Sequence, residues 1–124
     1  MTNELILIIE DDPNSRKLVR DVLKVKGYRT IESETGEEGV QLAFEHQPAL
    51  VLMDIQLPGI SGIEALKRLR ADPRTTALPV IAVTASVMNQ QESHIIDAGF
   101  DALERKPISV AALLAKIRIF IPAK

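Results

Sequence analysis

Short aliphatic runs alternate with longer amphipathic segments along this chain. Residues 5–9 are five consecutive aliphatic residues, a pattern typical of a strand covered on both faces of a parallel sheet. Comparable runs bounded by turn-forming residues follow, although 102–105 has weak strand propensity and is inferred mainly from the Lys106-Pro107 pair behind it. The pattern predicts five strands, at residues 5–9, 28–31, 50–53, 79–83 and 102–105.

Helix starts are marked by capping signals between the strands. Asp12 precedes Pro13, a pair that suits the N-cap and first position of a helix. Thr35 and Ser61 each stand three residues before a glutamate, which is capping-box spacing. Ser109 precedes an amphipathic segment that extends to about Phe120. These signals predict four helices with defined beginnings.

The helix ends and buried faces can also be predicted. We expect the first helix to end at Gly27 and the second before Pro48, and a further helix, with a less defined polar beginning at 89–92, to close at Gly99. In the helix after Ser61 one face is apolar and the opposite face is basic. Its expected buried residues are Ile63, Leu66 and Leu69, and its expected solvent-facing residues are Lys67, Arg68 and Arg70.

Five strands alternating with five helices indicate an α/β fold, a three-layer (βα)5 domain with a doubly wound parallel sheet. Right-handed crossovers leave few possible topologies. With 124 residues we expect a single domain over residues 1–124, with no room for a separate output module. We therefore expect a stand-alone protein.

Composition excludes several function classes. Apolar residues make up 46% and charged residues 26% of the chain, as in ordinary globular domains. No apolar run approaches the roughly 20 residues of a membrane-spanning helix, so we expect neither membrane association nor a secretory signal, and a cytoplasmic location. The absence of cysteine excludes disulfides and thiol chemistry, and the net charge of −2 argues against direct nucleic-acid binding. His46 and His94 lack metal-ligand spacing and are interpreted as surface helix residues.

Polar residues follow four of the predicted strands. Glu10, Asp11 and Asp12 follow the first strand, and single polar side chains follow three others: Asp54, Thr84 and Lys106. Carboxyl ends of strands line the ligand crevice of a doubly wound sheet, and in the expected strand order 2-1-3-4-5 the first and third strands are neighbours. Asp11 and Asp54 would then face each other, an arrangement that needs a cation. Magnesium is the expected ion.

Carboxylates, a divalent ion, a hydroxyl and an ammonium group suit phosphoryl transfer to an aspartate. Asp54 would be the nucleophile, Lys106 would neutralise charge, and Thr84 would donate a hydrogen bond to a phosphoryl oxygen. Taken singly, each residue also has a plain structural interpretation as a cap, a turn residue or a surface charge. Their combination at one edge favours chemistry.

Four sequence blocks resemble the signature motifs of response-regulator receiver domains, the CheY-like family. They are LILIIEDDP from Leu5, LMDIQLPGISG from Leu52, VTA from Val83 and KPIS from Lys106. The resemblance extends from Leu5 to about Ile121. It implies a two-component response regulator, a phosphoprotein of a phosphorelay, in which a histidine kinase or histidine phosphotransfer protein phosphorylates an aspartate. The donor, a downstream effector and Mg²⁺ are thus the implied partners and cofactor.

The resemblance also implies residue roles. Asp54 is the implied phosphoacceptor, with Thr84 and Lys106 as the switch hydroxyl and lysine. The implied metal ligands are Asp11 directly, Glu10 through water, Asp54, and the backbone carbonyl of Gln56. Pro107 is implied to follow a cis peptide bond, and Asp12 matches no ligand position and stays a cap. The protein is implied to be no enzyme but a phosphoacceptor that assists its own phosphorylation and dephosphorylation.

One position departs from the family pattern. Family members commonly carry an aromatic residue three positions before the lysine, where this chain has Leu103. Without a ring or hydroxyl the usual relay from threonine to aromatic residue changes, so we expect a muted or differently placed conformational signal.

Two alternatives to a phosphorylated receiver remain open. One is a degenerate receiver that acts as a phosphorylation-independent binding module, which Leu103 motivates. The other is a phosphohydrolase of the haloacid-dehalogenase type, which favours a second aspartate where this chain has Gln56. The oligomeric state, monomer or phosphorylation-dependent dimer, is also open.

Overall fold

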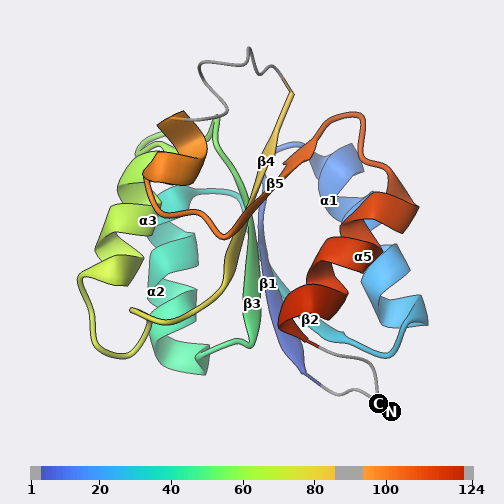
Figure 1. The fold of residues 1–124 in the computed structure, drawn as a ribbon, viewed down its shortest axis with the longest axis horizontal. Coiled ribbons are helices and arrows are strands. Elements are labelled where there is room, and N and C mark those ends of the chain that lie inside the picture. The colour runs from blue at the N-terminus through green and yellow to red at the C-terminus, as the bar shows by residue number, and fades with distance from the viewer. Residues whose placement is uncertain (1–3, 86–93, 122–124) are drawn as a thin grey trace.

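The computed structural model describes residues 4–85 and 94–121 and shows a five-stranded sheet between two layers of helices (Figure 1). Residues 94–97 are helical and belong to the helix expected before Gly99, whose expected beginning at 89–92 lies outside the described residues. The other elements, in chain order, are β1 (Leu5–Ile9), α1 (Pro13–Val25), β2 (Arg29–Ser33), α2 (Gly36–His46), β3 (Leu50–Asp54), α3 (Gly62–Arg70), β4 (Val80–Thr84), β5 (Ala102–Arg105) and α5 (Val110–Phe120).

The sheet has the predicted topology. Its strands are parallel and lie in the order β2-β1-β3-β4-β5. In Figure 1, α2 and α3 cover one face of the sheet and α1 and α5 cover the other. Because all strands run in the same direction, their carboxyl ends share one edge, the upper edge in Figure 1.

Strands β1, β3 and β4 are buried on both faces, which explains their continuous aliphatic sequences. In β1, alternate residues enter different clusters. Leu7 and Ile9 pack with α2 and α3 residues such as Ala43 and Leu66, whereas Ile6 and Ile8 pack with α1 and α5 residues. The two clusters clamp the central strands between the helix layers and hold their carboxyl ends in place.

Local capping follows the sequence signals. The side chains of Asp12, Thr35, Ser61 and Ser109 each accept a backbone N–H of the first helical turn, as predicted. His46 and His94 are exposed on helical segments, also as predicted. Within the described residues, the helices are too short or too polar to cross a membrane.

Strand β2 differs from its predicted bounds of 28–31. Tyr28 donates its backbone N–H to the Leu23 carbonyl at 3.0 Å and so closes α1 rather than opening the strand. At the other end, pairing with β1 continues through Glu32 and Ser33. These polar residues interrupt the aliphatic pattern, so the end of the strand could not be predicted from the sequence.

Arg70 contradicts its predicted place on the solvent-facing side of α3. Its side chain is half-buried, donates to the Gly99 carbonyl at 3.1 Å and pairs with Asp101 at 2.9 Å. Asp101 also accepts the backbone N–H of Val80 at 2.8 Å. The helix end therefore places Arg70 over loop carbonyls at the amino ends of β4 and β5, where a charged side chain finds acceptors.

Candidate functional site

Three carboxylates meet at the carboxyl edge of the two central strands. Glu10 and Asp11 follow β1, and Asp54 ends β3, its parallel neighbour. One oxygen from each residue lies within 4.8 Å of the other two. Glu10 and Asp54 are each 5% exposed, whereas Asp11 is at the surface. The fold thus brings together two buried acids and one that solvent can reach.

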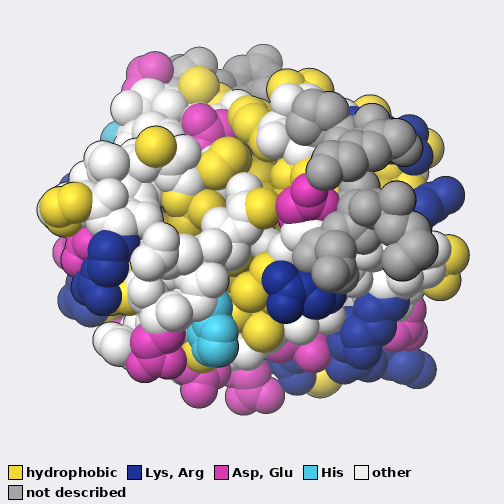
Figure 2. All heavy atoms as spheres, turned by 90° about the horizontal axis from the view of Figure 1, so that it is seen from below, with side chains coloured by type: hydrophobic (Ala, Val, Ile, Leu, Met, Phe, Trp, Pro, Cys, Tyr) yellow, Lys and Arg dark blue, Asp and Glu magenta, His cyan; other side chains and the backbone are white. Residues whose placement is uncertain are grey.

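The opposite edge of the sheet, where the strands begin, carries a different set of side chains. Figure 2, seen from below the view of Figure 1, shows hydrophobic side chains gathered in the middle of this face, with basic and acidic side chains beside and around them. The carboxylates of Glu10, Asp11 and Asp54 lie at the other edge, where the strands end.

Lys106 reaches the carboxylates from the loop after β5. Its Nζ lies 2.6 Å from Glu10 Oε1 and 3.1 Å from Asp54 Oδ2. Its backbone N–H donates to the Thr84 carbonyl at 2.8 Å, and its peptide bond to Pro107 is cis, as the resemblance implied. Lys106 thus places one positive charge between two buried acids. The ion pair with Glu10 was not foreseen from the sequence.

The two oxygens of Asp54 have different partners. Oδ1 accepts the backbone N–H of Gln56 at 2.9 Å, and Oδ2 faces Lys106. Gln56 was expected to offer its carbonyl to a metal ion, and that role stays a prediction. Thr84 ends the neighbouring strand β4 and is 2% exposed. A carboxylate, an ammonium group and a hydroxyl therefore come from neighbouring strands at one edge.

Burial dominates the protonation of Glu10. It raises the pKa of Glu10, the neighbouring Asp54 carboxyl raises it further, and the hydrogen bond from Lys106 opposes them only in part, so the pKa is about 7. For Lys106, burial lowers the pKa, but hydrogen bonds to Glu10 and Asp54 outweigh burial and the net pKa is raised. Near neutral pH the lysine is charged and Glu10 is close to its midpoint.

In metal-free buffer the free energy of unfolding should fall as pH rises from 4.5 to about 7. Unfolded Glu10 titrates near 4.5 and folded Glu10 near 7, so the folded state holds the extra proton between these values and rising pH favours unfolding. The loss should reach about 3 kcal/mol. Urea unfolding at several pH values measures it, with Glu10→Gln as the comparison because glutamine does not titrate. Parallel pH profiles for the two proteins would contradict the prediction.

Gly62 is required by close packing beside Asp54, a role that sequence reasoning missed. A Cβ at Gly62 would lie 2.6 Å from the Asp54 carbonyl oxygen and 2.8 Å from the Ile55 Cα. Its N–H donates to the Ile55 carbonyl at 2.9 Å. The first turn of α3 therefore lies directly against the strand end that carries Asp54. The glycine-rich loop signalled a turn but not this contact.

Leu103 packs against the hydrophobic cluster on the α2 and α3 face and is partly buried there. Its neighbours in β5, Ala102 and Glu104, point to the other face, where Ala102 packs with the second cluster and Glu104 pairs with Lys116 of α5. The expected effect of Leu103 on a conformational signal stays a prediction.

The donor set fits a hard divalent cation. Magnesium prefers carboxylate and carbonyl oxygens and keeps several of its waters. Asp11 is open to solvent and its oxygen lies near those of two buried acids. Clustered negative charge is costly unless cations lie among it, and Lys106 supplies one such charge. The residues present are those that a magnesium ion with bound water would use.

Comparisons with known proteins agree with this geometry. The family model of the response regulator receiver domain matches residues 6–118. The polar-differentiation response regulator DivK of Brucella ovis is 43% identical over 116 residues, 94% of each chain. The receiver domain of sensor histidine kinase PA1611 from Pseudomonas aeruginosa PAO1, solved with a magnesium ion in its active site cleft, superposes with a TM-score of 0.90 at 27% identity over 98% of this chain and 100% of that one. A CheY-like receiver domain protein from Methanospirillum hungatei JF-1 superposes with a TM-score of 0.84 at 29% identity, over 95% and 93%.

Proposed function

Because this chain belongs to the response regulator receiver domain family, we propose that Asp54 accepts a phosphoryl group from a histidine kinase or histidine phosphotransfer protein. Membership makes the protein a two-component receiver with a phosphoryl-accepting role in signalling. The observation that carries the residue assignment is the place of Asp54. It is a buried carboxylate at a strand end, with Lys106 Nζ at 3.1 Å and two further acids within 4.8 Å.

The reaction uses these groups in distinct roles. An Asp54 oxygen attacks phosphorus, the phosphorus–nitrogen bond of the donor histidine breaks, and the new bond is an acyl phosphate. Receiver domains bind magnesium at an acidic site, and when bound the ion neutralises charge on the phosphoryl oxygens. Asp11, Asp54 and the Gln56 carbonyl would hold it, with Glu10 acting through water.

Lys106 and Thr84 complete the proposed site. The ammonium group of Lys106 moves from its carboxylate partners to a phosphoryl oxygen, and the Thr84 hydroxyl donates to another. Through these contacts the protein assists its own phosphorylation and dephosphorylation. The co-location of Lys106 with Asp54 supports a phosphorylation-competent receiver over a degenerate binding module. Family membership likewise favours a receiver over a phosphohydrolase.

Receiver domains interact with histidine kinases and downstream effectors. For this chain we infer a cognate donor and an effector that recognises the phosphorylated surface, without direct binding of nucleic acid or membrane. We also propose that residues 1–124 form one receiver domain. The cytoplasmic location and the choice between a monomer and a phosphorylation-dependent dimer stay predictions.

Removal of magnesium should block phosphorylation. With acetyl phosphate and Mg²⁺ the protein should gain one phosphoryl group, and chelation should slow labelling at least about 100-fold, because the phosphoryl charge then lacks its main counter-ion. Intact-protein mass spectrometry over time measures the rate, and restoration by added Mg²⁺ is the control. Equal labelling rates with and without the chelator would contradict the proposed metal dependence.

A further inference from the structure

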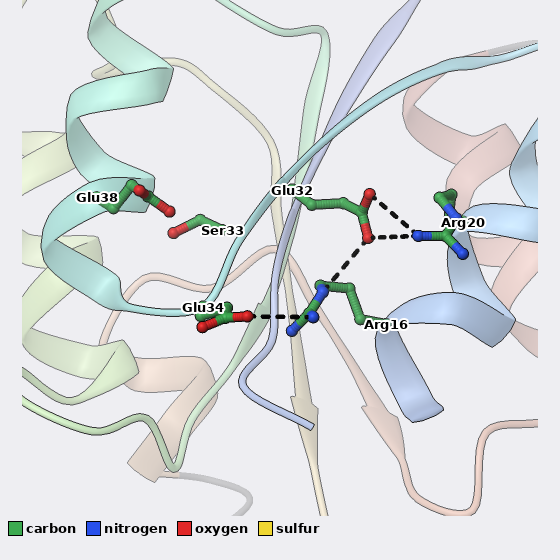
Figure 3. A pocket seen from close by; sticks show the side chains of 6 residues that line it. All are labelled: Arg16, Arg20, Glu32, Ser33, Glu34 and Glu38. Carbon is green, nitrogen blue, oxygen red and sulfur yellow. Dashed lines mark hydrogen bonds and ion pairs between the residues drawn. The ribbon is translucent and has the colours of Figure 1, made fainter. Parts of the chain in front are cut away.

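Beside the acidic cluster, on the side of β2, lies a polar pocket of about 360 Å³. Figure 3 shows its side chains, with Arg16 of α1 reaching toward Glu34 and Glu32. The residues that line the pocket are Arg16, Arg20, Glu32, Ser33, Glu34 and Glu38. Both arginines are paired with acids here, so the pocket floor is an ion-pair network rather than an open anion site.

The guanidinium group of Arg16 contacts three different acceptors. Its Nη1 donates to the backbone carbonyl of Glu10 at 2.8 Å. Its Nε lies 3.4 Å from Glu32 Oε1, and its Nη2 lies 3.3 Å from Glu34 Oε1. The side chain is only 16% exposed. Because a planar guanidinium presents its donors in a rigid fork, the two glutamates orient the third donor toward the Glu10 carbonyl.

The Glu10 carbonyl belongs to the peptide bond between Glu10 and Asp11, two acids of the proposed metal site. On its amino side, Glu10 donates its backbone N–H to the Ser33 carbonyl at 2.9 Å. Arg16 holds the carbonyl side of the same residue. Asp11, which follows directly, is exposed and belongs to the loop beyond β1. The direction of the Asp11 side chain therefore depends on how firmly the preceding peptide is held.

We propose that Arg16 is a positioning residue for the phosphoryl-transfer site. By fixing the Glu10–Asp11 peptide it presents the Asp11 carboxylate toward the magnesium position beside Asp54. The part that concerns metal binding rests on the proposed function; the part that concerns the order of the loop does not.

Arg20 offers a matched control. It also lies in α1, pairs with Glu32 at 3.3 Å and lines the same pocket. Its other ion pair within the described residues is with Asp21 at 3.4 Å, so its guanidinium group is directed to side-chain carboxylates and not to the Glu10 carbonyl. Arg20→Met removes the same charge from the same network while leaving the Glu10 carbonyl bond in place.

The experiment compares the wild type with Arg16→Met, Arg16→Lys and Arg20→Met. Amide hydrogen exchange at Asp11 and Asp12 is measured in metal-free protein, and the magnesium dissociation constant is measured by calorimetry under conditions where each variant is folded. Arg16→Met should accelerate exchange at both amides and weaken magnesium binding about 10-fold. Arg16→Lys should restore part of the amide protection and part of the magnesium affinity. For Arg20→Met, the exchange rates and the magnesium dissociation constant should stay within about twofold of the wild type.

Electrostatics alone predicts tighter magnesium binding in Arg16→Met, because loss of a nearby positive charge by itself favours cation binding. Weaker binding in Arg16→Met therefore reports geometry. Unchanged exchange in Arg16→Met, or a dissociation constant equal to that of Arg20→Met, would overturn the inference even if the variant were less stable. A wild-type protein that does not bind magnesium would instead contradict the proposed function, while the exchange data still decide the role of Arg16.

Discussion

Asp54→Asn is expected to lower phosphorylation by acetyl phosphate or a cognate donor by about 1,000-fold or more. The amide oxygen of asparagine is a poor nucleophile, and removal of the nucleophile removes the covalent step itself. The substitution is nearly isosteric. Its oxygen can still accept the Gln56 N–H that Asp54 Oδ1 accepts at 2.9 Å, so the loop after β3 should keep its shape.

The measurement is phosphoryl incorporation with magnesium present, followed by mass spectrometry. Asp12→Asn is the matched control, because Asp12 is an exposed acid near the site whose cap to the Asn14 N–H asparagine can retain. The control should be labelled like the wild type. Undiminished labelling of Asp54→Asn would refute the assignment of the acceptor.

Lys106→Met should slow phosphoryl transfer about 100-fold, because it removes the ammonium group that moves to a phosphoryl oxygen and stabilises its developing charge. It should also destabilise the metal-free protein by about 3 kcal/mol, since Glu10 and Asp54 would face each other without the ammonium group. The loss of stability should be larger above about pH 7, where Glu10 is ionised, than below it.

Labelling kinetics and urea unfolding together measure these two effects. Lys116→Met is the matched control, because Lys116 Nζ lies 2.7 Å from the buried Glu104, in a similar ion pair that does not include Asp54. This control should lose stability but keep its labelling rate while folded. If Lys106→Met were labelled at the wild-type rate, Lys106 would have no part in the transfer.

Much of the fold follows from local signals. The bounds of β1 and the beginnings of the four capped helices follow from aliphatic runs and capping side chains, which act within a few residues of chain. Predictions failed where a distant partner decides the local structure. Strand β2 continues through Glu32 and Ser33 because both pair with β1, and Arg70 turns inward because loop carbonyls and Asp101 lie beside the end of α3.

The residues of the candidate site likewise divide into those that the sequence predicted and those that it did not. Glu10, Asp11, Asp54, Thr84 and Lys106 could be named from the sequence because each follows a predicted strand, and parallel strands end at one edge. Gly62 and Arg16 could not be named. Gly62 is needed because α3 starts against the Asp54 carbonyl. Arg16 is needed because it reaches the Glu10 carbonyl, six residues earlier in the chain.

The amino-acid sequence by itself thus determined which groups are available for chemistry and at which edge they lie, because strand alternation and helix caps are properties of short segments. Tertiary structure decided which of these groups touch. It placed Lys106 on Glu10 as well as Asp54, raised the pKa of Glu10 to about 7 through burial, and brought Arg16 to the loop between two acids. The physical reason is that burial and charge pairing depend on side chains far apart in sequence, which only the packed sheet and helices bring within contact distance.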